Sequence, residues 1–222
     1  MLKIYRHTFI VIIFVALTSV ALQSHIDLVA LTANYNGEAA ESLEFITELA
    51  VWGWGLALFI WSLTLIMRRI EKYRDNFDNS VKVLYVILLM PAIISFVAQM
   101  AFWAIVSGLF DPVVGEKVIF GAVSVLVIMI GNYGVSVRKA WFTGLPLPWI
   151  MASDRIWQKT HRCLGRLFML MGAIALFSLF IWPTTLVIIG MTVGFIACLA
   201  ISILYSLWLA RCDPLRIDNS AL

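Results

Sequence analysis

The most constraining feature of the sequence is a series of six long apolar runs that carry almost no charge. They fall at roughly 8–24, 49–67, 83–110, 118–137, 163–182 and 185–210. Each run is near or above the length that a helix needs to cross a hydrocarbon layer about 30 Å thick. The chain is also 62% hydrophobic and only 13% charged, which is more apolar surface than a water-soluble core of this size can bury. We therefore predict an all-α, polytopic membrane helix bundle with six transmembrane helices, and the lipid bilayer as its main partner.

The first run also resembles a secretory signal peptide. Thr8 to Ser24 follows Lys3 and Arg6, and small residues lie near its end. Against cleavage, the run is long enough to span a membrane, and no clean small-x-small site precedes Leu28. We expect an uncleaved first helix and keep the signal peptide as the alternative.

The distribution of Lys and Arg predicts the orientation, because cytoplasmic loops of membrane proteins are enriched in both. The net charge is only +3, and the basic residues stand in short blocks between apolar runs, so we expect no direct contact with nucleic acid. Six spans with both termini in the cytoplasm place all the basic residues except Lys117 inside. These residues are Lys3, Arg6, Arg68, Arg69, Lys72, Arg74, Lys82, Arg138, Lys139, Arg155, Lys159, Arg162, Arg166, Arg211 and Arg216.

The six spans divide into two halves of three helices each. Residues 1–112 form an N-terminal half with an acidic outer loop, and residues 113–222 form a C-terminal half with a basic, aromatic inner loop. In the outer loop, Glu38, Glu41, Glu44 and Glu48 precede or enter the second span. At helical spacing the last three share a face opposite Leu43 and Ile46. This surface attracts a cationic peptide or metal ion, or it is simply a solvated face that keeps the segment outside.

The inner loop between the fourth and fifth spans is the most distinctive segment. Pro146 and Pro148 forbid a helix across 144–149, whereas Ser153 followed by Asp154 predicts the start of a helix that runs into the fifth span. On that helix Trp157 and His161 are four residues apart and share a face. Composition alone favours an aromatic belt at the inner interface, with His161 near water.

Chemistry inside the membrane has few candidates. Gln99, Ser95 and Ser124 fit hydrogen bonds between helices, and Gln99 with Asn132 offers a polar path only if the protein is a small transporter or channel. Asp154, His161 and Cys163 resemble a catalytic group, but we expect a solvated cluster beside the membrane. The three histidines are widely separated, so we predict no enzyme, no cofactor and no metal site.

The residues around the inner loop resemble the SdpI family of bacterial membrane proteins. The family signature has a Gly-Asn pair at the end of a span, a turn with a glycine and a tryptophan, and a W-x-x-T-H-R segment. Here Gly131 and Asn132 are followed by Gly144 and Trp149, and then by Trp157-Gln-Lys-Thr160-His161-Arg162 and Gly165. The turn departs from the family in having Pro146 where a basic residue is usual, and Asn36-Gly37-Glu38 resembles the outer turn of many relatives only weakly.

The resemblance implies a multi-pass protein of the bacterial cytoplasmic (inner) membrane. It also implies immunity, because the named family member protects its producer from a secreted membrane-active toxin peptide and holds a repressor at the membrane in signalling. The partners implied are therefore a toxin peptide and a cytoplasmic regulator. Lipid-facing and subunit-facing surfaces have the same composition, so the sequence leaves the oligomeric state open.

Overall fold

The computed structural model describes residues 2–25, 35–72 and 74–212, and every regular element in these ranges is a helix. Six helices are long. They are α1 (Leu2–His25), α3 (Glu38–Ile70), α5 (Val81–Val106), α6 (Pro112–Gly134), α8 (Asp154–Ser178) and α9 (Thr184–Cys212). Two are short, α4 (Arg74–Asn79) and α7 (Pro148–Met151). The predicted all-α class is confirmed.

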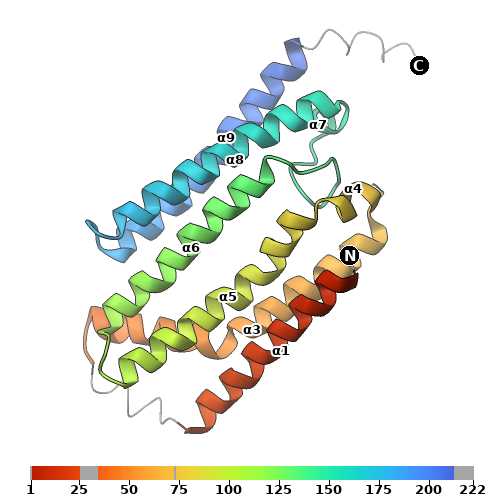
Figure 1. The fold of residues 1–222 in the computed structure, drawn as a ribbon. Coiled ribbons are helices and arrows are strands. Elements are labelled where there is room, and N and C mark those ends of the chain that lie inside the picture. Colours follow the sequence, from red (N-terminus) through yellow and green to blue (C-terminus); the bar gives the residue numbers. More distant parts are fainter. Residues whose placement is uncertain (1, 26–34, 73, 213–222) are drawn as a thin grey trace.

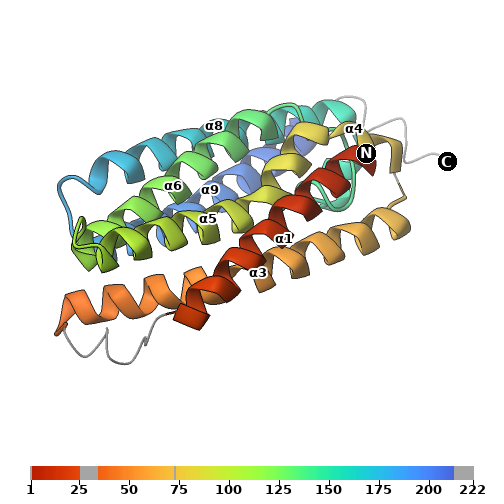
Figure 2. The same cartoon turned by 60° about the horizontal axis from the view of Figure 1, so that its bottom comes forward.

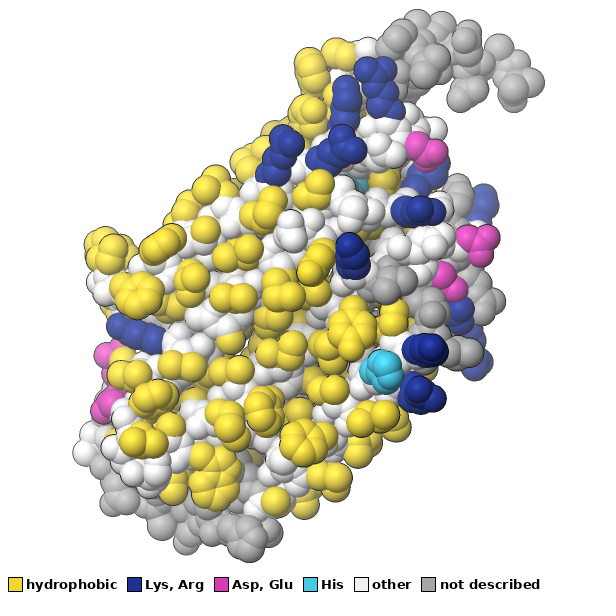
Figure 3. All heavy atoms as spheres, viewed as in Figure 1, with side chains coloured by type: hydrophobic (Ala, Val, Ile, Leu, Met, Phe, Trp, Pro, Cys, Tyr) yellow, Lys and Arg dark blue, Asp and Glu magenta, His cyan; other side chains and the backbone are white. Residues whose placement is uncertain are grey.

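The long helices run side by side along one axis, so the bundle has two ends (Figures 1 and 2). We call the end with α4, α7 and the start of α1 the basic end, and the opposite end, where α3 and α6 begin, the acidic end. Side chains of Lys and Arg gather at the basic end, while apolar side chains cover the flank between the ends (Figure 3). Of the charged residues used to predict orientation, Arg216 lies outside the described residues.

Five of the described helices are long and apolar enough to cross a membrane: α1, α3, α5, α6 and α9. The exception is α8, because its first four turns carry Asp154 and several basic residues. Its apolar part begins only after Arg166 and continues to the end of the helix at Ser178. Most of the sequence run 163–182 is therefore the C-terminal part of a longer helix whose first turns are amphipathic, and residues 179–182 form the turn that follows it.

Local sequence explains where several helices begin and end. Asp111 caps α6 by accepting a hydrogen bond from the Val113 amide at 2.9 Å, and Pro112 occupies the first helical turn, where a missing amide hydrogen costs nothing. Gly37 starts α3 with a φ of 59°, a left-handed conformation that glycine adopts without strain. Ser153 is the residue before α8, as predicted, although its side chain makes no capping hydrogen bond.

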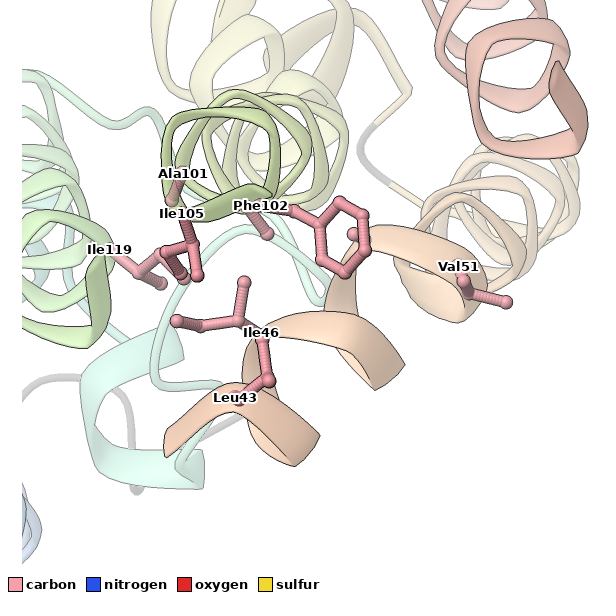
Figure 4. Packing of buried hydrophobic residues seen from close by; sticks show 9 residues of the cluster. Leu43, Ile46, Val51, Ala101, Phe102, Ile105 and Ile119 are labelled. Atoms are coloured by element: carbon pink, nitrogen blue, oxygen red, sulfur yellow. The ribbon is translucent and has the colours of Figure 1, made fainter. Parts of the chain in front are cut away.

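The acidic end is held together by apolar side chains of α3, α5 and α6. Leu43 and Ile46 on α3 pack with Phe102, Ile105 and Ile119 (Figure 4). The opposite face of the same turns carries Glu38, Glu41, Glu44 and Glu48, and all four are exposed. The four carboxylates therefore lie on the side of α3 that faces away from the apolar cluster of Leu43 and Ile46. At 33 residues this helix is about 50 Å long, so it exceeds the apolar layer that it crosses.

Gln99 is the polar centre of the N-terminal helices. Its amide nitrogen lies 2.7 Å from the Ser19 hydroxyl on α1 and 3.3 Å from the Ala50 carbonyl on α3. The hydroxyl of Thr18 donates to the Gln99 amide oxygen at 2.6 Å. The predicted interhelical role of Gln99 is confirmed. Asn132 is exposed at the far end of α6, so the two residues are not brought together along one polar path.

Glycines allow α6 and α8 to approach closely. A Cβ atom on Gly165 would lie 2.5 Å from the Gly131 carbonyl oxygen, and one on Gly172 would lie 2.8 Å from the Ser124 carbonyl oxygen. Near the other end of the pair, Gly121 on α6 faces Leu176 and Leu179 at ordinary contact distance. The two helices are thus antiparallel neighbours over most of their length. Close backbone approach at small residues is a common way to pack helices in lipid.

Candidate functional site

The motif residues of the sequence meet at the basic end, where α8 begins beneath the loop that follows α6. Trp157 is only 1% exposed, and its ring stacks on that of His161 with centroids 4.0 Å apart. The Trp157 indole N–H donates to the Val137 carbonyl oxygen at 2.9 Å. The side chains that the pattern placed on one helix face are therefore a buried contact between α8 and the loop.

His161 is buried, with 4% of its surface exposed, and both ring nitrogens have partners. The Leu145 amide donates to Nε2 over 3.2 Å, so Nε2 must be unprotonated. The proton is then on Nδ1, which lies 2.9 Å from the Trp157 carbonyl oxygen. Burial of the imidazole lowers the pKa of His161, because the charged form loses its hydration.

This geometry corrects two expectations from the sequence. The first is that His161 lies near water, and the second is that Asp154, His161 and Cys163 form a solvated cluster. Asp154 does point to solvent, where it pairs with Lys139 at 2.7 Å, but His161 is enclosed by the loop. The reason is that residues 144 and 145 fold back over the ring, which no spacing on α8 could reveal.

Gly144 is the residue that permits this close cover. A Cβ atom at this position would overlap His161 Nε2 and would lie 2.9 Å from the edge of the Trp157 ring. The backbone conformation of Gly144 is not left-handed, so the requirement is one of space rather than of dihedral angle. We call Gly144, Leu145, Trp157 and His161 the loop lock, because the loop is fixed to α8 through them.

The prediction that Pro146 and Pro148 forbid a helix across 144–149 is wrong at its last two positions. Residues 144–147 are not helical, but Pro148 starts the short helix α7, where proline is tolerated in the first turn. Trp149 in this turn is half-buried, and its indole N–H donates to the Ser206 hydroxyl on α9 at 3.0 Å. The turn thereby connects the loop to α9.

The remaining motif residues have different surroundings. Thr160 is fully buried, and no described residue accepts or donates a hydrogen bond at its hydroxyl. Gly131 and Gly165 form the close helix contact described above. Arg162 and Asn132 are exposed, so they are the motif side chains that a partner could reach.

No pattern along the chain indicated the residues that fasten the loop to the N-terminal half. Glu71 is 6% exposed and accepts a hydrogen bond from the Phe142 amide at 3.1 Å. The Asn76 side chain donates to the Lys139 carbonyl oxygen at 2.9 Å. Both interactions use backbone groups of the loop, which are present whatever the side chains are. No pair of residue types in the sequence therefore predicts them.

Comparison with known families agrees with the motif residues. Residues 136–206 match the model of the SdpI/YfhL protein family. This segment, 71 of the 222 residues, is similar to that family. It includes Gly144, Trp149, Trp157, Thr160, His161, Arg162 and Gly165, whereas Gly131 and Asn132 precede it. No curated protein and no solved structure matches the chain significantly.

Proposed function

We propose that the chain is a non-enzymatic, SdpI-type protein of the bacterial cytoplasmic membrane that confers immunity to a membrane-active toxin peptide. The observation that carries this proposal is the SdpI/YfhL match across the loop lock and the helices that follow it. The arrangement at the basic end is structural in character, since its central side chains are buried and bonded to each other. Recognition of the toxin therefore belongs to another surface.

Six spans with both termini inside complete the proposed topology. The span needed to complete the six is α8, the fifth in chain order, which lies antiparallel to α6 from Gly165 beside Gly131 to Leu176 beside Gly121. α6 is itself long and apolar enough to span a membrane. Because α8 lies beside α6 over most of the length of α6, α8 would lie at the same depth in the bilayer. The gathering of Lys and Arg at the basic end supports a cytoplasmic position for that end.

The acidic face of α3 is the proposed first contact for a cationic peptide. Glu38, Glu41, Glu44 and Glu48 are exposed along one side of a helix, and Leu43 on the other side is fully buried. A row of carboxylates attracts a cationic ligand and raises its local concentration near the membrane. The face is anchored to α6 as well, since the Ser42 hydroxyl donates to a Glu116 carboxylate oxygen at 2.7 Å.

The absence of catalysis is part of the proposal. Its support is that two of the side chains that resemble a catalytic group already have other partners. Asp154 pairs with Lys139, and His161 uses both ring nitrogens within the loop lock. Proton transfer by an imidazole requires a ring nitrogen that is free to meet the reacting group.

The test is survival of a sensitive bacterium that expresses the chain, measured against a panel of cationic membrane-active peptides. We expect protection by the parent, reduced protection by E41Q/E44Q/E48Q, and protection close to the parent by E41D/E44D/E48D, which keeps the charge. Membrane amounts of all three must be equal. Protection retained by the Gln variant, which keeps the side-chain length, but lost in the Asp variant would show that side-chain length rather than charge matters, and no protection by the parent would refute the immunity proposal.

A docking site for a cytoplasmic regulator is the second candidate, and one observation favours it. Trp141 is 43% exposed and Phe142 is 39% exposed at the tip of the loop, next to Arg138. Exposed aromatic side chains with a charged rim resemble the anchors of protein interfaces. A photo-crosslinker at Trp141 should capture a soluble protein in cells, whereas one at Trp208, which is exposed on α9, should capture only lipid or membrane proteins.

A further inference from the structure

A polar hollow of about 450 Å³ lies beside the loop lock, between α4, the loop after α6 and the first turns of α8. Its volume lies within the range of small-ligand sites, about 300–1,000 Å³. Arg138 and Lys139 line it from the loop, and Gln158 and Arg162 line it from α8. Neither the family match nor the immunity proposal assigns it a ligand.

The charges around the hollow do not balance. Lys139 is paired with Asp154 at 2.7 Å, so these two lining residues offset each other. Arg138 and Arg162 are both exposed, and no carboxylate of the described residues pairs with either. The hollow therefore presents two uncompensated guanidinium groups from two different elements, which favours an anion between them.

The hollow also lies at a definite depth in the bundle. Its loop residues begin at Val135, directly after the last turn of α6, and its α8 residues precede the apolar run that starts after Arg166. The ends of spanning helices lie at the level of lipid headgroups. The acyl chains of an anionic lipid whose headgroup occupies this hollow would therefore lie along the apolar flank visible in Figure 3.

We propose that this hollow binds the phosphate of an anionic phospholipid headgroup. Guanidinium groups are planar donors that match phosphate oxygens in pairs, and they lose less hydration energy than an ammonium group on doing so. Arg138 and Arg162 hold the phosphate from opposite walls, and the amide of Gln158 is placed to bond the polar part of the headgroup. The site is independent of the immunity proposal and can be tested without it.

The experiment is native mass spectrometry of the full-length protein in detergent, titrated with phosphatidylglycerol or with phosphatidylcholine. We expect a preference for phosphatidylglycerol. A hydrogen bond from a guanidinium group to a phosphate contributes about tenfold or more in affinity, so R138Q/R162Q should weaken binding by about 100-fold. The matched control is R155Q/R166Q, which removes two exposed arginines of α8 that do not line the hollow, and which should change affinity less than about threefold.

Several results would overturn the proposal. Equal weakening in the two double variants would mean that diffuse surface charge binds the lipid, and no preference for phosphatidylglycerol would mean that no headgroup is recognised. Displacement of the lipid by millimolar inorganic phosphate would identify free phosphate as the ligand instead. R138K/R162K keeps the charge without the paired geometry, so it should recover only part of the affinity. Thermal unfolding of each variant without added lipid separates loss of the site from loss of the fold.

Discussion

Gly144→Ala is the sharpest test of the loop lock, because one methyl group is placed where two buried rings already lie. The added Cβ atom would overlap His161 Nε2 and meet the Trp157 ring at 2.9 Å. Neither ring can move away, since Trp157 is fixed to the Val137 carbonyl and His161 to the carbonyl of Trp157. The loop must therefore lift, and the Leu145 amide loses its 3.2 Å hydrogen bond to Nε2.

The expected cost follows from two contributions. Overpacking a filled site costs about 1–3 kcal/mol, and a buried acceptor left without its donor costs about 1–3 kcal/mol. Together they lower the free energy of unfolding by about 2–6 kcal/mol. For a chain of this size, about 2–4 °C is lost per kcal/mol, so the melting temperature should fall by roughly 4–24 °C.

The assay is thermal unfolding of the purified protein in detergent, followed by near-ultraviolet circular dichroism. Gly134→Ala is the matched control, because a Cβ atom on this α6 glycine meets no atom within 4 Å. In a helix this change removes chain entropy from the unfolded state, so it should leave stability equal or slightly higher. A Gly144→Ala melting temperature within a degree of the parent would refute the steric account of the loop lock.

The other predictions concern helix packing, pH and the polar centre. Gly165→Ala should destabilise the protein, because its Cβ atom would meet backbone atoms of α6, whereas Gly121→Ala has room and should not; thermal unfolding of the pair checks this. The lowered pKa of His161 means that the unfolded chain binds the proton more readily than the folded one. Stability should therefore be full above the unfolded pKa of about 6.5 and fall as the pH drops through it, and a His161→Gln variant should show a flatter dependence in melting curves between pH 8 and 5. Gln99→Ala should cost about 1–3 kcal/mol because it removes the hydrogen bonds of a buried side chain to α1 and α3, and Asn132→Ala on the exposed side of α6 should be nearly neutral by the same assay.

The loop lock gives a physical reason for the motif of the SdpI-type segment. Trp157, His161 and the glycine at position 144 form one packed unit, in which each residue is required by the other two. Arg162 follows them on α8 but is directed outward, toward the polar hollow. The motif thus combines residues that hold the loop in place with one that remains free to meet a partner or a lipid.

The sequence by itself determined the features that depend on composition along the chain. The lengths of the apolar runs, the spacing of Glu41, Glu44 and Glu48 on one helical face, and the blocks of Lys and Arg are all local properties. Such local properties do not depend on the tertiary contacts, because the length and the flanking charges of each segment decide whether and in which direction it spans the bilayer. The motif from Trp157 to Arg162 could be found in the same way.

Only the tertiary structure decided which polar and small residues meet. The spacing on α8 alone predicts a solvated His161, but the loop at Gly144 folds over it and buries it. Glu71 accepts a hydrogen bond from the Phe142 amide, which lies 71 positions away in the sequence. The role of Gly131 and Gly165 is visible only in the structure, where they allow the backbones of α6 and α8 to approach closely. Burial and close approach depend on several elements at once, and no single segment contains that information.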